Sequence, residues 1–405
     1  MARVRQIFKD DHIPDVKGAV TSALEAVGLA GRIKPGQDVA LTAGSRGIAE
    51  IATIVRAVAD AVRAAGATPF VVPAMGSHGG ATADGQREVL AGYGITAETV
   101  GCDVRSSMDV VNLGTLPNGA GVYFDRNAFN ADATIVIGRV KSHTAFRAPI
   151  ESGLCKMVAV GLGKRQGADA MHSHGLADSV PLAAALSLRK ANVVLGLAIV
   201  ENAYEKVHAI KAVLPDAFHQ TDRDLLRLAN KQLLRVPFDQ LDLLVVDEMG
   251  KNISGSGMDY NIIGMWRRLG GERVPMFKRI AVLNLTAETH GNALGLGAAD
   301  FTTRRLVDQV DFAKTYMNAL TANFPETGKV PITLSNDREA IEVALRSSAP
   351  AGAPRVARIR STLHLETLEI SEGLLTEAKA DPRLEIVDDV HPWAFDDEGN
   401  VAEPV

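Results

Sequence analysis

Residues 39–76 read VALTAGSRGIAEIATIVRAVADAVRAAGATPFVVPAMG, and their pattern of apolar residues indicates the fold class. VALT is a short apolar run typical of a buried strand. The segment from Ser45 to Gly66 has apolar residues at helical spacing and ends at a glycine suited to a helix C-cap. TPFVVPAMG returns to a strand pattern. Strand, helix, strand is typical of an α/β fold with a parallel sheet, whose ligands bind at the carboxyl ends of the strands.

The same alternation continues along the chain. A loop and a helix follow in SHGGATADGQREVLAGYG, and strands are predicted in ATIVIG (133–138) and NVVLGLAIVEN (192–202), with the helix SVPLAAALSLRKA before the second. Residues 211–234 are predicted to be mostly helical. These segments are the signature of one α/β domain.

A second series of strands and loops starts at LDLLVVDEMG (241–250) and continues in RIAVLNLT (279–286). A helix is predicted over about residues 302–320, and the tail from His391 is predicted to be irregular. Because the α/β pattern restarts near residue 240, we expect two α/β domains, residues 1–240 and 241–405.

Composition narrows the class of protein. The chain has 405 residues, 46% of them hydrophobic and 22% charged, with a formal net charge of −5, so neither nucleic acid nor an anionic membrane is an expected partner. Its two cysteines, Cys102 and Cys155, cannot form a disulfide framework or a Cys-rich metal site. Since the sequence has neither a membrane-spanning apolar run nor an apolar signal core in MARVRQIFKDD, we expect a cytoplasmic protein.

Two loops follow the first two strands. GSRG (44–47) puts Arg46 at a helix amino terminus, where backbone amides, the helix dipole and a guanidinium can bind an anion. The full glycine fingerprint of a dinucleotide fold is absent, so a well-capped helix with an exposed arginine explains this loop equally well. GSHGG (76–80) surrounds His78 with glycines, which allow a ligand to approach the imidazole closely and favour a working histidine over a core one.

The stretch GRVKSHTAFRAPIESGLCKMVAVGLGKRQGADAMHSHG, residues 138–175, concentrates candidate chemistry. It contains His143, His172 and His174, and it places Lys156 in the apolar segment LCKMVAVGLG. A lysine that loses hydration shifts toward its neutral, nucleophilic form, and histidine changes charge near neutral pH. The pattern alone leaves solvated polar residues on a strand, a loop and a helix as an equal alternative. If MHSHG continues a helix, the last two imidazoles point about 200° apart, so only one can face a site.

Glycine-rich loops also follow the strands of the second series. KNISGSGMDYNIIGM is shaped for close approach to a ligand, and its polar residues are Lys251, Asn252 and Asp259. We take Lys251 and Asn252 as candidates for substrate binding. AETHGNALGLGAADF is a second such loop, with Glu288 and His290.

These motifs carry a resemblance that covers most of the chain. The sequence resembles the nickel-pincer-nucleotide-dependent lactate racemase family, within its broader set of 2-hydroxyacid racemases and epimerases. The matching motifs are SRG with Arg46, GSHGG with His78, KSH with His143, LCK with Lys156 and ADAMH with His172. The loops DEMGKNISGSGMD and ETHGNALGLGAADF are similar to one branch of the family rather than to lactate racemase proper.

The resemblance implies a two-domain α/β fold with the active site in the cleft between the domains. It also implies a pyridinium mononucleotide whose two sulfur-bearing arms hold nickel through sulfur, carbon and sulfur. Lys156 would tether one arm through a thioamide, and His172 would supply the remaining nickel ligand. Ser45 and Arg46 would contact the cofactor, with the substrate carboxylate as the alternative partner of Arg46.

By the same resemblance, His78 and His143 would be the acid and base on opposite faces of a 2-hydroxyacid. The C2 hydrogen beside an ionised carboxylate is hardly acidic, so its removal as hydride by an electrophilic ring suits the reaction. An imidazole suits the hydroxyl proton because its pKa near 6.5 allows both protonation states. Sulfur and imidazole are also ligands suited to nickel.

Two departures concern the substrate more than the cofactor. The family has an acidic residue shortly before the arginine of the first loop, and Ala43 stands at that place here. The segment between His143 and Lys156 is also a few residues longer than in lactate racemase. The expected partners are a small-molecule 2-hydroxyacid, lactate-like or a sugar acid, and the proteins that make the cofactor. The oligomeric state, including a homo-oligomer, stays open.

Three other functions fit parts of the sequence. A protein that binds or carries a nickel nucleotide without turnover would keep Lys156 and His172 but would not need both His78 and His143. A nicotinamide-dependent dehydrogenase is disfavoured by the missing glycine fingerprint. A zinc hydrolase is disfavoured because the histidines lack close ligand spacing and have no glutamate base beside them.

Overall fold

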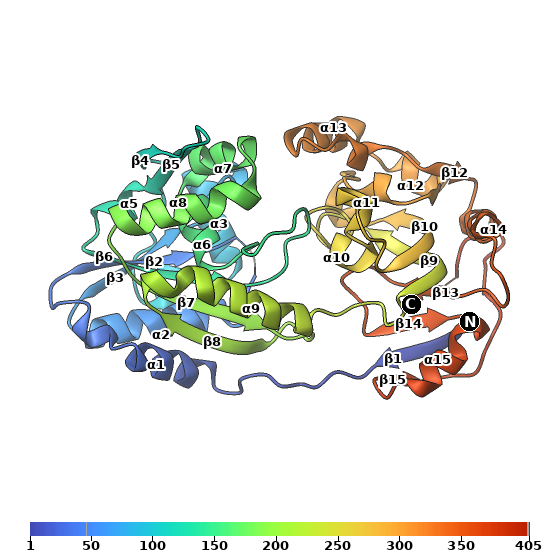
Figure 1. The fold of residues 1–405 in the computed structure, drawn as a ribbon, viewed down its shortest axis with the longest axis horizontal. Coiled ribbons are helices and arrows are strands. Elements are labelled where there is room, and N and C mark those ends of the chain that lie inside the picture. Colours follow the sequence, from blue (N-terminus) through green and yellow to red (C-terminus); the bar gives the residue numbers. More distant parts are fainter. Residues whose placement is uncertain (46, 403–404) are drawn as a thin grey trace. The chain divides into compact units, whose positions relative to one another are not determined.

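A computed structural model describes residues 1–45, 47–402 and 405 (Figure 1). The chain forms two compact units, one of residues Asp10–Leu233 and one of Met1–Lys9 together with Leu234–Val405. Each unit contains a sheet with parallel strands and covering helices, so the predicted α/β class is confirmed.

The unit of residues 10–233 is built on a five-stranded sheet. The strand order is β3 (Thr68–Pro73), β2 (Asp38–Ala43), β6 (Ala133–Arg139), β7 (Val193–Glu201) and β8 (Val207–Val213). The first four strands are parallel, and β8 pairs antiparallel with β7. A separate hairpin is made by β4 (Val110–Thr115) and β5 (Gly121–Asp125). Residues 211–234, predicted to be mostly helical, begin instead with the end of β8.

Alternating side chains of this sheet enter two hydrophobic cores. Val39 and Leu41 of β2 lie in one core, and Ala40 between them lies in the other. Apolar residues of α1 and α2 enter the first core, and those of α8 and α9 enter the second. The sheet is therefore covered on both faces, which explains why its strands are continuous apolar runs.

The helices of this unit are α1 (Val16–Ala26), α2 (Ile51–Ala64), α3 (Ala83–Gly92), α4 (Ala97–Val100), α5 (Arg126–Asn130), α6 (Leu154–Lys156), α7 (Lys164–Ser173), α8 (Leu176–Lys190) and α9 (Phe218–Gln232).

The second unit has an eight-stranded sheet. The order is β12 (Ile332–Leu334), β11 (Phe301–Thr303), β10 (Met276–Leu285), β9 (Gln240–Met249), β13 (Val356–Ile359), β14 (Thr367–Ile370), β1 (Ala2–Gln6) and β15 (Leu384–Ile386). The strands from β12 to β13 are parallel, whereas β14, β1 and β15 add antiparallel pairs. The helices are α10 (Tyr260–Ile263), α11 (Trp266–Leu269), α12 (Arg304–Asp308), α13 (Phe312–Thr321), α14 (Asp337–Ser348) and α15 (Leu375–Ala380).

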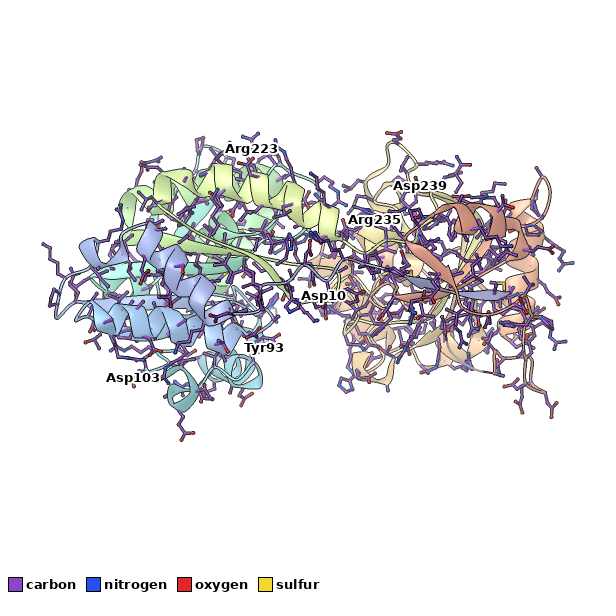
Figure 2. The ribbon with its side chains drawn as sticks, turned by 90° about the horizontal axis from the view of Figure 1, so that it is seen from below. Asp10, Tyr93, Asp103, Arg223, Arg235 and Asp239 are labelled. Carbon is purple, nitrogen blue, oxygen red and sulfur yellow. The ribbon has the colours of Figure 1, made fainter. Side chains whose placement is uncertain are left out.

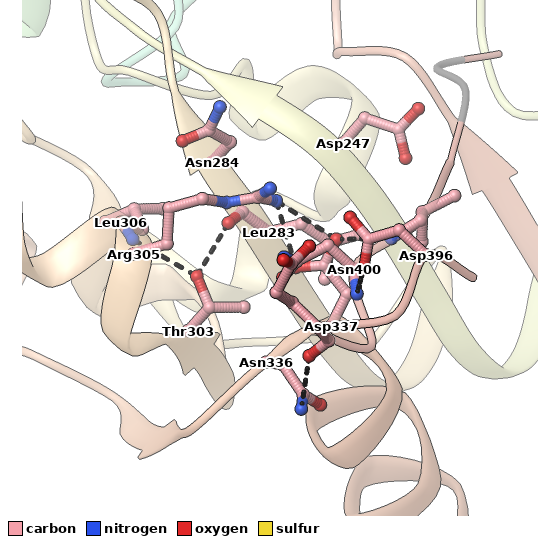
Figure 3. A network of polar contacts seen from close by, with 12 residues as sticks. Asp247, Leu283, Asn284, Thr303, Arg305, Leu306, Asn336, Asp337, Asp396 and Asn400 are labelled. Atoms are coloured by element: carbon pink, nitrogen blue, oxygen red, sulfur yellow. Dashed lines mark hydrogen bonds and ion pairs between the residues drawn. The ribbon is translucent and has the colours of Figure 1, made fainter.

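One prediction in this unit is wrong. The helix predicted over residues 302–320 is interrupted, because Thr303 ends β11 and caps α12, and Asp311 caps a new helix, α13. Among its described residues, the tail from His391 is irregular as predicted, apart from an isolated bridge between Phe395 and Val401. Asp337 receives hydrogen bonds from Arg305 at 3.0 Å and from the amide of Val401 at 2.9 Å, in the network that Figure 3 shows. The Val401 contact attaches the tail to the start of α14.

Candidate active site

The candidate site of the first unit lies where its strand order reverses. The chain passes from β2 to β3 on one side, and β6 lies on the other side of β2. The loops after β2 and β6 therefore diverge at the carboxyl ends of the strands, which is where open α/β sheets bind ligands. The three loops after β2, β3 and β6 carry Ser45, His78 and His143, respectively.

Packing holds these loops next to the segment that contains Lys156. A Cβ atom placed on Gly44 would lie 3.6 Å from Met157 Cε, and one placed on Gly138 would lie 2.8 Å from Met157 Cγ. The amide of Gly76 donates to the carbonyl oxygen of Gly161 at 3.1 Å. The glycines after β2 and β3 and at the end of β6 thus allow residues 157–161 to approach the sheet closely.

The loop after β3 brings His78 to Ser45. The distance from Ser45 Oγ to His78 Nδ1 is 2.5 Å, and the imidazole is exposed. Tyr93, which follows α3 and is labelled in Figure 2, donates its hydroxyl to the carbonyl oxygen of Ser45 at 2.8 Å. If the imidazole donates from Nδ1 to Ser45, its Nε2 is left as a proton acceptor.

A buried ion pair lies beneath this loop, and the sequence analysis did not single it out. Lys164 Nζ is 3.0 Å from Asp125 Oδ2, and both side chains are 0% exposed. Gln86 Oε1 accepts from Lys164 at 3.2 Å, and Gln86 Nε2 donates to the carbonyl oxygens of Gly76 and His78 at 2.8 and 3.2 Å. The ion pair is therefore connected through one glutamine to the backbone that carries His78.

Burial acts against both charges of this pair. It lowers the pKa of Lys164, while the charge of Asp125 raises it. It raises the pKa of Asp125, while Lys164 lowers it. Each partner offsets the cost of burying the other, so removal of one alone leaves an uncompensated charge. Lys164 also has a left-handed backbone conformation, with φ of 53°, which is uncommon outside glycine.

The loop after β6 is closed by a carboxylate. Glu151, 4% exposed, accepts from the backbone amides of His143 at 2.7 Å and Ala148 at 3.2 Å, and Arg147 lies 3.4 Å away. Burial raises the pKa of Glu151, and the hydrogen bond from the His143 amide is the largest opposing effect. The amide of Ala145 donates to His143 Nδ1 at 3.1 Å, so a neutral His143 carries its proton on Nε2.

Lys156 ends α6 and is followed by the π-helical turn Met157–Gly161. Its Nζ lies 5.6 Å from the ring centroid of Phe146, whose ring is 4.4 Å from that of His143. The aromatic ring therefore lies beside both predicted site residues. Single π-helical turns inside helices are frequent at functional sites.

A second buried carboxylate holds the segment before Lys156. Asp222 of α9 accepts from the amides of Leu154 at 2.9 Å and Cys155 at 2.8 Å. Gly153 precedes them with φ of 88°, and a Cβ atom there would lie 2.2 Å from Asp222 Oδ1, so the position requires glycine. Burial raises the pKa of Asp222 to about 6, against the effect of the two amide hydrogen bonds.

The two histidines at the end of α7 have different partners. His174 follows the helix, and its Nδ1 lies 2.9 Å from the carbonyl oxygen of Ala170, which caps the helix end. The pKa of His172 is lowered, first by partial loss of hydration and then by the charge of Lys156, whereas Asp169 raises it. The His172 residue is exposed to solvent, so the surrounding protein removes only part of its hydration. Lys156 and His172 are thus close enough to interact electrostatically.

The remaining predicted site residues are Arg46, Lys251 and Asn252. Arg46 falls outside the described residues. Lys251 and Asn252 belong to the other unit, where they follow β9. Lys251 Nζ donates to Asn318, and Asn252 Oδ1 accepts from the Thr286 hydroxyl at 2.6 Å.

Among the described residues, no group of three or more His, Cys, Asp or Glu side chains is arranged to hold a metal ion. Within the same part of the chain, none of the helices combines the length and apolar character that crossing a membrane requires.

The first unit is an α/β domain. Its candidate residues come from loops at the carboxyl ends of the strands, near the point where the strand order reverses. Residues 9–181 match the family model described as the lactate racemase N-terminal domain, which confirms the predicted resemblance to the lactate racemase family. No curated protein matches the sequence.

A solved structure supports the fold over nearly the whole chain. It is that of the lactate racemase apoprotein from Thermoanaerobacterium thermosaccharolyticum, with 12% sequence identity and a TM-score of 0.50. The match covers 95% of this chain and 97% of that chain. At this identity the likeness concerns the fold alone.

Proposed function

We propose that the protein is a racemase or epimerase of a 2-hydroxyacid that uses a nickel-pincer pyridinium nucleotide. The observation that supports this function best is the grouping of candidate residues in a lactate racemase N-terminal domain. Ser45 contacts His78, and Phe146 lies beside both His143 and Lys156. The substrate is lactate-like or a sugar acid.

The described residues fit the proposed cofactor in two respects. Lys156 is half-buried at the end of a helix and lies near His172, so one side chain can tether an organic group while the other reaches its metal. A nickel ion held mainly by sulfur and carbon atoms of the cofactor needs one imidazole from the protein rather than a cluster of protein ligands. His172 would supply that ligand, and Ser45 would contact the nucleotide.

The histidines His78 and His143 would move the proton of the C2 hydroxyl. When bound, the cofactor supplies an electrophilic pyridinium ring that accepts the C2 hydrogen with its electron pair. One imidazole takes the hydroxyl proton of one enantiomer, and the other returns a proton as the opposite enantiomer forms. A hydrogen bond donated from His78 Nδ1 to Ser45 would leave Nε2 as the atom that accepts this proton. His143 must release the Ala145 amide before its Nδ1 can hold a proton.

The fate of the C2 hydrogen tests the reaction. The protein produced together with the cofactor-making proteins should convert a C2-deuterated 2-hydroxyacid in ordinary water with the deuterium retained in the product. Rapid loss of deuterium to water would indicate carbanion chemistry and would contradict hydride transfer. Nickel and nucleotide bound without conversion of any of a panel of 2-hydroxyacids would instead favour a carrier.

Cofactor attachment is tested separately by mass and metal analysis. The loaded chain should be heavier by the cofactor fragment, and Lys156→Ala should lack this adduct. His172→Ala should lose most of the nickel while keeping the fold, because one ligand is removed. An unmodified but active chain would mean that Lys156 is only a charge partner, and full nickel content in His172→Ala would refute its assignment as ligand.

A further inference from the structure

A small basic pocket lies in the second unit, at the amino ends of β10 and β11. Its volume is about 270 Å³, and its main lining residues are Trp266, Arg267, Arg273, Lys278, Arg279 and Asp300. The loop with Lys251 and Asn252 follows the carboxyl end of β9, which is parallel to β10. The pocket is therefore at the opposite edge of the sheet from that loop.

Positive charge exceeds negative charge around this pocket. Asp300 is the carboxylate in the lining, 3.3 Å from Arg267, and Lys278 is paired with Asp242 outside the lining at 2.7 Å. Arg279 donates to the hydroxyl and carbonyl oxygens of Ser347, which carry no charge. Within the described part of the chain, no ion pair joins Arg273 or Arg279 to a carboxylate.

The guanidinium of Arg267 is fixed in the wall of the pocket. Its side chain is 8% exposed, and it donates to the carbonyl oxygens of Ala298 at 3.0 Å and Phe277 at 2.7 Å. Its Nε has no hydrogen-bond partner among the described residues. Burial lowers the pKa of Arg267, and Asp300 opposes this. The pocket thus contains a preorganised, incompletely paired cation.

A second guanidinium lies on the same aromatic ring. Arg267 Cζ is 4.7 Å and Arg273 Cζ 5.1 Å from the ring centroid of Trp266. Cations gathered around one hollow repel one another, and a bound anion would remove this repulsion. Arginine binds phosphate and carboxylate through two parallel N–H donors, and a phosphate can accept from several such groups at once.

We propose that this pocket binds a phosphate group, either as inorganic phosphate or as the phosphate end of a small metabolite. The proposal does not depend on the function proposed for the first unit. The direct contacts would come from Arg273 and Arg279, with Arg267 supplying fixed positive charge. Because the pocket is at the amino ends of the strands, its ligand would not be the group that reacts.

The pocket contains its own reporter, because Trp266 is one of only two tryptophans in the chain. Trp393→Phe leaves Trp266 as the only indole, and a phenylalanine keeps an aromatic ring against Phe395. In this background, titration with inorganic phosphate at constant ionic strength should change the fluorescence to saturation in the millimolar range or below. Pyrophosphate and glycerol phosphate, titrated in parallel, distinguish the free ion from phosphate esters.

Variants that each remove one positive charge test whether phosphate binds in the pocket. Arg273→Gln, an exposed position, and Arg279→Gln should each raise the apparent dissociation constant by about tenfold, which corresponds to about 1.4 kcal/mol. Arg304→Gln makes the same charge change at an exposed position outside the lining and should leave the constant nearly unchanged. Equal weakening in all three variants would indicate nonspecific ion screening and would overturn the proposal.

Equilibrium dialysis with labelled phosphate measures binding directly, even if binding does not change the fluorescence of Trp266. Binding of about one phosphate per chain that is lost in Arg273→Gln would support the proposal even if the fluorescence did not change. No saturable binding in either measurement for phosphate, pyrophosphate and glycerol phosphate would overturn it. Because none of these readouts involves nickel or a 2-hydroxyacid, failure here leaves the proposed racemase activity untouched.

Discussion

The two histidine-bearing loops of the first unit are held by different kinds of buried charge. The His78 loop is attached through Gln86 to a fully buried ion pair, Lys164 and Asp125. The loop with His143 and the segment with Lys156 are held by the buried carboxylates Glu151 and Asp222, which bind backbone amides.

Because the supports differ, the two loops should respond differently to mutation and to pH. An ion pair keeps its two charges over the neutral range but fails when either partner is removed. A carboxylate that binds amides keeps its hydrogen bonds only in part when protonated, and burial already raises its pKa. The first loop should therefore be sensitive to mutation, and the second to pH.

The largest effect concerns the two imidazoles themselves. His78→Ala and His143→Ala should each lower conversion in both directions by about 10²–10⁴-fold, because every turnover would use one imidazole as base and the other as acid. Steady-state rates of the nickel-loaded enzyme with each enantiomer measure this. Nickel content should be unchanged in both variants. Normal rates in either variant would show that its loop is not part of an acid/base pair.

The next effect concerns the ion pair. Lys164→Met should lower the free energy of unfolding by about 3–5 kcal/mol, because Asp125 would remain buried without its partner. Arg165→Gln next to it removes an exposed pair with Asp169 and should change stability by about 0–1 kcal/mol. Urea unfolding of both variants provides the comparison.

A double variant separates the charge from the packing of Lys164. Asp125→Asn keeps an oxygen for the Ala128 amide but removes the buried charge, so Lys164→Met with Asp125→Asn should recover part of the lost stability. A double variant less stable than Lys164→Met alone would argue that Asp125 is not the uncompensated charge.

A smaller effect should appear in the pH dependence of stability. The pKa of Asp222 is raised from its ordinary 3.8 to about 6, so between these values the folded chain binds more protons than the unfolded chain. This group therefore stabilises the fold most at low pH, and its contribution falls by roughly 3 kcal/mol as the pH rises through 6.

The variant Asp222→Asn isolates this contribution because it does not titrate. The unfolding free energy of the wild type minus that of the variant should fall from about pH 4 to pH 7 and then stay level. A difference that rises with pH would mean that Asp222 is ionised in the fold with a lowered pKa. Nearby Glu151 is left unchanged and serves as an internal background.

Elements with a clear local pattern of apolar residues could be predicted from the sequence, whereas interruptions within such a pattern could not. The strands and the helix of residues 39–76 were predictable, because β2 is a continuous apolar run and α2 repeats apolar residues at helical spacing. The interruption of residues 302–320 was not, since it depends on the caps Thr303 and Asp311 within a pattern that remains apolar.

The supports of the candidate site could not be predicted from local pattern. Lys164 lies in GLGKRQG, which resembles a solvated turn, and its partner Asp125 is on the hairpin strand β5. Asp222 reaches Leu154 and Cys155 across more than sixty residues. Long-range pairs of this kind leave no periodic trace in a single sequence. The roles of His78, His143, Lys156 and His172 remain predictions.

The smallest expected effect compares two partners of the His78 loop. Ser45→Ala removes the hydroxyl next to His78 Nδ1, whereas Tyr93→Phe removes the hydrogen bond to the Ser45 carbonyl oxygen. Each should change the unfolding free energy by about 0.5–1.5 kcal/mol, since both bonds are near the surface. Only Ser45→Ala should also disturb the protonation of the imidazole. We expect its turnover to fall by about tenfold, equivalent to one hydrogen bond, with a shifted pH profile, while Tyr93→Phe keeps the wild-type profile. Identical profiles in the two variants would mean that Ser45 supports the loop without orienting His78.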